Sequence, residues 1–256
     1  MNILPTNQTM ECNRKLIEEI DSALLKLESS KLFHEQTFSS LISRQGLDQC
    51  GYREAFPQLL FDVKTLKSDD SSWSLAPAVC YHAFLSFKNS LLNSPQRVTA
   101  RSRCFRNEEY VVPGRRQIEF EMREFILIGQ PDWLESQLET WQTTISSFAK
   151  ELDIIGRWQS AIDPFFLPLS KGRALMQRLL NTKLEFCLED GLAIASINRH
   201  RKHFTERLSI EIENPAVQTQ DGKSEDRSMP HSACIAFGLD RWAQARRMTY
   251  SKSAIE

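Results

Sequence analysis

The sequence lacks the features that direct a protein to a membrane, to export or to a nucleic acid. It has no run of about 18 or more apolar residues, and its first residues, MNILPTNQTMECNRK, contain no positive stretch followed by an apolar one. Lysine and arginine number 32 against 33 aspartates and glutamates, so the net charge of −1 offers no overall basic excess to a nucleic acid or a phospholipid surface. A soluble, cytoplasmic protein without a membrane partner is expected.

Paired cysteine motifs, internal repeats and low-complexity segments are also missing. The six cysteines form no CxxC pair, and in a cytoplasmic chain they are expected to be free thiols, with metal ligation by a few of them left open. They are Cys12, Cys50, Cys80, Cys104, Cys187 and Cys234. With 256 residues, 41% of them hydrophobic, the chain can bury the core of one large or two small domains.

Apolar periodicity predicts helices at about 11–29 and about 169–182. In the first, leucine and isoleucine recur at helical spacing with Glu and Lys between them. The second precedes two strand-like runs, KLEFCL and LAIASIN, on either side of the turn-forming EDG. The stretch GLDQCGYREAFPQLLFDVKTL mixes Gly, Pro and short apolar runs and predicts loops and short strands, and residues 214–230 predict a surface loop.

A third helix is predicted after Pro131. Asp132 is expected to cap this helix and Glu135 to complete a capping box. Apolar residues then follow at alternating spacings of four and three, which is typical of a helix with one buried face. They are Leu134, Leu138, Trp141, Ile145, Phe148 and Leu152.

Charged residues run through a predicted β-hairpin that turns at VVPG, where Pro113 and Gly114 break the strands. Strand alternation places Val98, Ala100, Ser102, Cys104, Arg106 and Glu108 on one face of the outgoing strand. On the return strand it places Ile118, Phe120, Met122, Glu124 and Ile126 on one face. Glu124 therefore lies in a row that looks buried, where a carboxylate needs a cation or a metal. From the residues alone, an internal salt bridge, for example to Arg106, is the preferred interpretation.

Several motifs carry a family resemblance. FRNE (105–108), with Arg116 and Phe120 in RxxxF spacing, resembles the second signature motif of class II aminoacyl-tRNA synthetases, and CIAFGLDRWAQA (234–245) resembles the third. GYREAFP (51–57) resembles the first, dimer-forming motif. Together with LAPAVCYHAF, AIDPFF, KLE and ASINRHRKHF, these stretches are similar to the amino acid:[carrier protein] ligases, which are stand-alone relatives of the atypical, zinc-dependent seryl-tRNA synthetases.

The resemblance implies a fold and an assembly. The fold is the α+β class II catalytic fold, with an antiparallel sheet flanked by helices. The implied arrangement is a single domain over 1–256, with an N-terminal helical segment at about 1–50 and a helical insertion at about 131–182. A homodimer is also implied.

The resemblance also assigns the nucleotide site. It implies ATP binding by Arg106, Glu108, Arg116, Phe120, Gly238 and Arg241, with Arg106 and Arg241 as the catalytic residues. Arg106 would bind the α-phosphate and the carboxylate of the amino acid, and Phe120 would stack on adenine, with Arg241 over its other face. A guanidinium suits this role because it presents two parallel donors to developing negative charge. Without the family, core packing for Phe120 and a surface salt bridge for Arg241 would be preferred.

A zinc site is implied as well. The ligands that match the family are Cys80, Glu124 and Cys234, and they leave a fourth position for the amino group of the substrate. Either cysteine alone would be read as a small buried apolar residue. Glu124, Ser196 and Asn198 are the implied substrate-binding residues, and magnesium is expected only with ATP. Two residues depart from the family pattern. Ala236 stands where classical synthetases have a glycine, and Ala193 stands where seryl synthetases have an acidic residue.

The implied function is ATP-dependent activation of a small amino acid, glycine or alanine, and its transfer to the phosphopantetheine thiol of a carrier protein. The helix after Pro131 lies where the ligases have a helical insertion that docks the carrier. Apart from RHRKH (199–203), the sequence has no basic stretch that could bind tRNA. A tRNA acceptor is therefore not expected. Transfer to another acceptor and a non-catalytic synthetase-like binding protein remain as alternatives.

Overall fold

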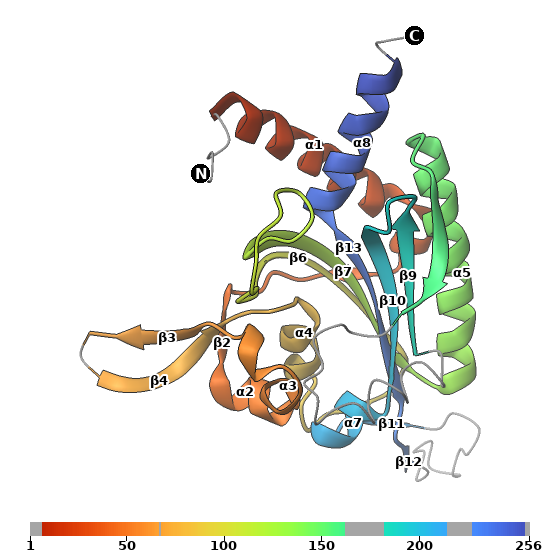
Figure 1. Ribbon diagram of the computed structural model, residues 1–256. Helices are drawn as coiled ribbons and strands as arrows, with labels where there is room; N and C mark the ends of the chain where they lie inside the picture. The colour runs from red at the N-terminus through yellow and green to blue at the C-terminus, as the bar shows by residue number, and fades with distance from the viewer. Residues whose placement is uncertain (1–6, 67, 162–181, 214–226, 254–256) are drawn as a thin grey trace.

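A seven-stranded sheet forms the centre of the protein (Figure 1). The computed structural model describes residues 7–66, 68–161, 182–213 and 227–253. The strand order is β1 (His34–Glu35), β6 (Gln96–Phe105), β7 (Glu119–Gly129), β13 (His231–Gly238), β10 (Ala193–Arg201), β9 (Lys183–Leu188) and β8 (Gly156–Ser160). All neighbouring strands in it are antiparallel except β1, which pairs parallel to β6. The predicted α+β class with an antiparallel sheet is confirmed.

The register of β6 and β7 confirms the predicted faces within the two strands, but Arg106, Glu108 and Ile118, which were predicted to continue these faces, lie outside the strands. The opposed pairs are Val98 with Ile126, Ala100 with Glu124, Ser102 with Met122 and Cys104 with Phe120. Directly opposed residues of an antiparallel pair lie on the same face, so the two predicted rows form one surface. The strands end at Phe105 and restart at Glu119, so the turn is part of a longer loop, 106–118, in which Gly114 has a positive φ of 72°.

Three long helices cover one face of the sheet, here called the back face: α1 (Asn7–Lys26), α5 (Pro131–Glu151) and α8 (Leu239–Ser253) (Figure 1). The predicted stripe of α5 is buried in the core on this face, where Trp141 packs against Phe125 of β7 with ring centroids 4.4 Å apart. Burying one such large apolar side chain contributes about 1.5–3 kcal/mol. The predicted helix at 11–29 corresponds to α1 and the short turn η1 (Glu28–Ser30).

The predicted capping of α5 is wrong. Its N-cap is Gln130, without a side-chain cap, and Pro131 is the first helical residue. Proline favours this position because its missing N–H is not needed there and its φ already suits a helix. Asp132 therefore lies in the first turn, and Glu135 forms an ion pair of 2.9 Å with Arg199 of β10 instead of a capping bond.

Shorter elements lie on the opposite face, here called the front face. They are α2 (Arg44–Gln49), α3 (Tyr52–Ala55), η2 (Pro57–Leu59), α4 (Cys80–Ser86) and α7 (His203–Arg207). Two small sheets complete the fold, one of β2 (Leu41–Ser43), β3 (Asp62–Thr65) and β4 (Ser68–Leu75), the other of β5 (Leu91–Leu92), β11 (Glu211–Glu213) and β12 (Arg227–Ser228).

Part of the GLDQCGYREAF stretch is helical, where loops and short strands were predicted. Ser43 caps α2 by accepting a 3.0 Å hydrogen bond from the Gly46 amide, and Leu47 and Tyr52 are buried. The strands predicted around EDG are β9 and β10. The helix predicted at 169–182 and most of the loop predicted at 214–230 lie outside the described residues. None of the described helices is both long and apolar enough to cross a membrane.

Candidate active site

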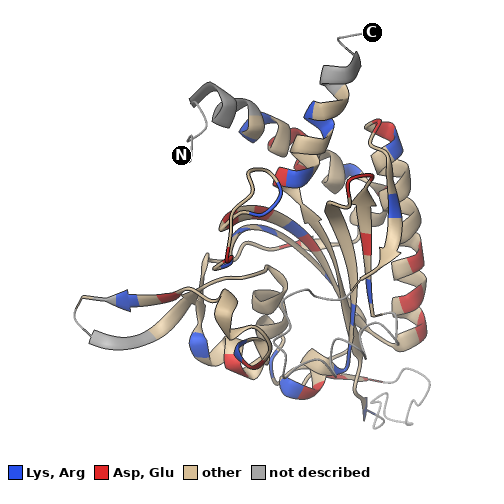
Figure 2. Ribbon diagram, in the orientation of Figure 1, with Lys and Arg blue, Asp and Glu red and all other residues tan. Residues whose placement is uncertain are grey.

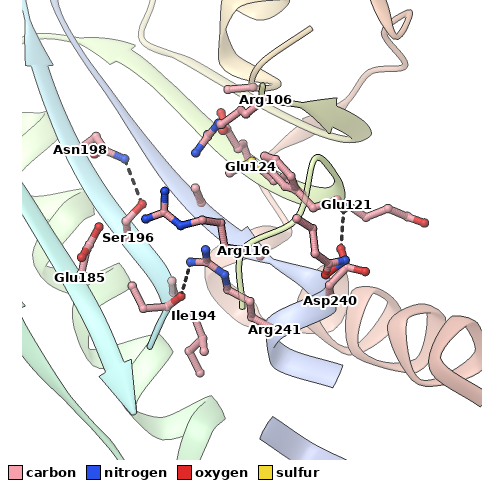
Figure 3. A pocket seen from close by; sticks show the side chains of 18 of the residues that line it. Arg106, Arg116, Glu121, Glu124, Glu185, Ile194, Ser196, Asn198, Asp240 and Arg241 are labelled. Carbon is pink, nitrogen blue, oxygen red and sulfur yellow. Dashed lines mark hydrogen bonds between the residues drawn. The ribbon is translucent and has the colours of Figure 1, made fainter. Parts of the chain in front are cut away.

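The front face of the sheet forms the floor of a cleft of about 640 Å³ (Figure 3). This volume is typical of sites for small ligands and cofactors. The lining includes alternating residues of three neighbouring strands. They are Phe120, Met122 and Glu124 of β7, Ser196, Asn198 and His200 of β10, and Cys234, Ala236 and Gly238 of β13. Glu185 of β9, Cys80 of α4 and Arg241 of α8 also line it. The cleft therefore gathers residues from distant parts of the sequence.

The loop 106–118 and the strand that follows it hold the predicted nucleotide residues together. Arg106 donates from Nε to the Pro77 carbonyl at 3.1 Å, and its guanidinium lies 5.0 Å from the centre of the Phe120 ring. Glu108 accepts a 2.8 Å hydrogen bond from Arg116, and its side chain is only 6% exposed. The two charges of this ion pair fix each other at the rim of the cleft.

Phe120 lies both against the core and at the cleft. It packs against the buried cluster of Val79, Ala100 and Cys104, as the core-packing interpretation predicted. It also lines the cleft, with Arg106 over its ring. One ring can therefore contribute to the core and to a ligand site.

Arg241 spans the wall of the cleft between two segments. Its Nη1 donates to the Ala193 carbonyl and its Nη2 to the Arg115 carbonyl, both at 2.7 Å. Burial lowers the pKa of Arg241. The two backbone bonds fix the guanidinium at the cleft, which does not fit a surface salt bridge.

Asp240 is a residue of the cleft that the sequence did not single out. Its Oδ2 accepts a 2.6 Å hydrogen bond from the Glu121 amide, which ties the start of α8 to β7. Gly238, predicted to bind ATP, ends β13 just before this turn. Because α8 starts at the cleft, its backbone N–H groups and dipole favour an anion there.

The predicted metal ligands come together, and a histidine joins them. Cys80 begins α4, and its sulfur, the sulfur of Cys234 and a ring nitrogen of His200 all lie within 4.8 Å of one another. His200 Nε2 is 3.2 Å from Cys234 Sγ, and Asn198 Nδ2 donates to the same sulfur at 3.6 Å. Glu124 lies beside Cys80, since the two residues form a hydrogen bond.

Proton affinities in this cluster are strongly perturbed. The pKa of Cys80 is well above its ordinary value because its thiol donates a hydrogen bond to Cys234, and burial adds to the effect. That same hydrogen bond, together with His200, holds the pKa of Cys234 well below its ordinary value. Burial, followed by the charge of Cys234, raises the pKa of Glu124 to about 8, although Arg106 acts in the opposite direction.

A metal cation fits these residues. Glu124 is 2% exposed, and its Oε2 has no hydrogen-bond partner among the described residues. Buried polar atoms without a partner are rare and call for an explanation such as an absent ion. Two thiolates, a carboxylate and an imidazole are ligands that zinc prefers, and thiolates form readily at a metal. The positive charge of Arg106 lowers the pKa of Glu124 less than burial raises it. The salt bridge to Arg106 that the sequence favoured is therefore insufficient to compensate this carboxylate.

Ser196 and Asn198 lie on the same floor as predicted, with Asn198 Nδ2 donating to Ser196 Oγ at 3.1 Å (Figure 3). Glu185 lies opposite Ser196 in the sheet and pairs with Lys183 at 3.0 Å. The sequence motif KLE included Glu185 without giving it a role. His200 was also missed, although it follows Ser196 and Asn198 at strand spacing, which was the available signal.

Comparison with known proteins supports the resemblance. No family model matches the chain. Two curated proteins of Bradyrhizobium diazoefficiens, named amino acid–[acyl-carrier-protein] ligase 1 and 2, are each 29% identical to it, over 83% and 84% of this chain and 70% and 69% of their own lengths. The chain is thus similar to these ligases over most of its length.

Solved structures show the fold of the chain. The seryl-tRNA synthetase of M. kandleri, solved with tRNASec of A. aeolicus, matches with a TM-score of 0.74 and 18% identity, over 92% of this chain and 51% of the synthetase. The seryl-tRNA synthetase of Pyrococcus horikoshii, solved with ATP, gives 0.67 and 15%, over 90% and 51%. The chain thus spans about half the length of these synthetases, and the predicted class II catalytic fold is confirmed.

Proposed function

We propose that this protein is a ligase that activates a small amino acid, glycine or alanine, with ATP and passes it to the phosphopantetheine thiol of a carrier protein. One observation carries the proposal. In a chain similar to the amino acid–[acyl-carrier-protein] ligases, the predicted nucleotide residues and the predicted metal residues line a single cleft.

The first step forms an aminoacyl-adenylate. A carboxylate oxygen of the amino acid attacks the α-phosphorus of ATP, the bond from that phosphorus to the bridging oxygen breaks, and pyrophosphate leaves. Arg106 and Arg241 would neutralise the charge that develops, because fixed donors cost no reorganisation during the reaction. Both are held in advance, Arg106 by the Pro77 carbonyl and Arg241 by two carbonyls. Mg²⁺ is proposed to accompany ATP.

The amino acid would lie on the floor of the cleft. Cys80, Glu124 and Cys234 would hold zinc, which supplies a Lewis acid for the unprotonated amino group of the substrate. Ser196 and Asn198 would lie beside the side chain of the substrate and leave room for a short one. Positioning of this kind directs the carboxylate towards ATP.

In the second step, the carrier thiol attacks the carbonyl carbon of the adenylate and AMP leaves, giving a thioester. The helix α5 was predicted to dock the carrier, but its apolar face is buried against the sheet. Figure 2 shows acidic residues along the helix, and they are Asp132, Glu135, Glu139 and Glu151. An acidic carrier would therefore need positive charge from elsewhere, and Arg201 and Lys202 are exposed. A homodimer is also proposed, and a tRNA acceptor is not.

The test is amino-acid-dependent exchange between ATP and pyrophosphate across the twenty amino acids, with zinc measured on the same sample. Cys234→Ala or Glu124→Ala should remove zinc and amino-acid activation and leave ATP binding largely intact. Cys187→Ala is the matched control, because this cysteine is also buried but lies outside the cleft. The proposal fails if no amino acid supports exchange and no zinc is bound. Transfer of labelled amino acid to a carrier protein, a tRNA or a small thiol then identifies the acceptor.

A further inference from the structure

His200 occupies an irregular position in the sheet. Between β10 and β13, Asn198 pairs with Cys234 and Arg199 with Ala233, but Arg201 pairs with Ser232, so the register slips at His200. Arg201 adopts a left-handed φ of 51°. A bulge of this kind inserts one unpaired residue and redirects its side chain.

The ring of His200 is held in one orientation by aromatic neighbours. It packs edge-on against Phe204, at 4.8 Å between ring centroids and 77° between planes, and against Phe84 at 5.7 Å and 86°. Phe84 and Phe204 stack on each other at 4.1 Å. The imidazole is therefore fixed with Nε2 directed at the Cys234 sulfur.

The distances suit a shared cation. Zinc binds imidazole nitrogen at about 2.0 Å and thiolate sulfur at about 2.3 Å, and tetrahedral angles then place the two donor atoms about 3.5 Å apart. His200 Nε2 and Cys234 Sγ are 3.2 Å apart, and Cys80 Sγ lies within 4.8 Å of both. The unpartnered Glu124 Oε2 is an independent sign that a cation belongs beside these residues.

We propose that His200 is a metal ligand of this protein and completes a donor set with Cys80, Glu124 and Cys234. Four protein donors would close the resting site. One consequence rests on the proposed function: the amino group of the substrate would compete with His200 for the metal.

X-ray absorption at the zinc edge of the substrate-free protein tests the proposal. The expected result is two sulfur neighbours and the scattering pattern of one imidazole. His200→Ala should remove the imidazole pattern and weaken zinc binding by at least about 10- to 100-fold, the loss typical even of residues that only support a ligand. His203→Ala is the matched control, because this histidine is exposed and contacts the Cys50 carbonyl instead. If His200→Ala does not fold, His200→Cys should retain zinc with three sulfur neighbours.

The proposal is overturned if zinc in the wild-type protein lacks an imidazole neighbour, if the protein binds no zinc, or if His200→Ala binds zinc as tightly as the wild type. ATP–pyrophosphate exchange on the same sample separates the two proposals. Exchange with zinc but without an imidazole neighbour overturns the role of His200 alone. An imidazole neighbour without exchange for any amino acid supports the role of His200 and counts against the proposed function.

Discussion

A single methyl group added at Gly114 tests the geometry of the loop 106–118. Gly114 has a φ of 72°, and a Cβ there would lie 1.8 Å from Oε1 and 2.5 Å from Cδ of Gln244 on α8. Gly191, in the turn between β9 and β10, has a similar φ of 81°, but a Cβ there would meet no atom within 4 Å. Gly191→Ala therefore isolates the backbone cost, and Gly114→Ala adds a steric clash to it.

The two costs can be estimated separately. A left-handed φ costs a non-glycine residue about 1–2 kcal/mol, and the smaller entropy of the unfolded alanine chain returns about 0.4–1 kcal/mol. Gly191→Ala should then lower the free energy of unfolding by about 1 kcal/mol. Gly114→Ala should lose a further 1–3 kcal/mol or so, as is typical of overpacking, because the Gln244 Oε1 it meets is buried.

Urea unfolding measures both variants, and Gln244→Ala completes a double-mutant cycle. Removing the Gln244 amide should restore the part of the Gly114→Ala loss that comes from the clash. The KM for ATP in the exchange reaction should rise in Gly114→Ala, because the same loop holds the ion pair of Glu108 and Arg116. Equal losses for the two glycine variants, with no recovery on removing Gln244, would refute the reasoning.

Other side chains give predictions of stability, pH dependence and reactivity. Asp21→Asn should lower the free energy of unfolding by about 3 kcal/mol, because Arg123 would lose its buried partner. Glu18→Gln should lower it by less than about 1 kcal/mol, because the side chain of Glu18 is 58% exposed. Similar losses for the two variants in urea unfolding would contradict this. Burial raises the pKa of Asp240 above its ordinary value of 3.8. The wild type therefore loses stability as pH rises from 3.8 through the folded pKa, because the carboxylate form is disfavoured in the folded state. Asp240→Asn should avoid this loss and gain stability relative to the wild type above pH 3.8. A pH-independent difference in unfolding free energy would count against that. On the zinc proposal, chelation should speed alkylation of Cys234, because the hydrogen bond from the neighbouring cysteine keeps the pKa of Cys234 low. An unchanged alkylation rate by mass spectrometry would show that no metal shields this thiol.

Strand alternation predicted the faces of β6 and β7 because a period of two holds wherever the pairing is regular. It therefore placed Glu124 correctly in a buried row, opposite Ala100. It also placed Arg106 and Glu108 on the outgoing strand, and this was wrong, because both follow the end of β6 and lie in the loop. Their positions depend on contacts with distant segments, such as the Pro77 carbonyl.

Helix prediction succeeded where the periodic stripe was long and failed where it was short. The helix α5 has 21 residues, and its apolar stripe is buried from Leu134 to Phe148. The helices α2 and α3 have six and four residues, which is too few for a recurring apolar pattern. Burial of Leu47 and Tyr52 in a separate small core supports them instead. Such tertiary support is not visible in the sequence.

His200 shows how a single irregularity hides a residue. In the sequence it stands inside the basic segment RHRKH, which is typical of a solvated charged surface. Its neighbours Arg199 and Arg201 do turn away from the cleft, since neither lines it. The bulge and the aromatic pair that orient His200 arise only when β10, β13, α4 and α7 assemble.

Two adjacent charged residues on β7 are compensated differently on the two faces of the sheet. Arg123 and Glu124 point to opposite faces of the sheet, and each is 2% exposed. Arg123 is compensated on the back face by both carboxylate oxygens of Asp21 and by Glu35, all at 2.7 Å. On the front face, Glu124 Oε2 has no hydrogen-bond partner within the described part of the chain. A buried carboxylate oxygen without a partner is costly when the group is charged, and on the zinc proposal a bound ion would compensate it.

Glu124→Gln tests that argument. With a folded pKa of about 8, Glu124 as a carboxylate lowers stability progressively as pH rises from its ordinary pKa of 4.5 towards 8. In chelator near pH 8, Glu124→Gln should therefore be at least as stable as the wild type. With zinc at about 100 times its Kd, only the wild type should gain about 2.7 kcal/mol from binding. Urea unfolding with and without zinc measures both differences. If the variant is less stable by the same amount in both conditions, Glu124 contributes by packing, and a metal does not compensate its charge.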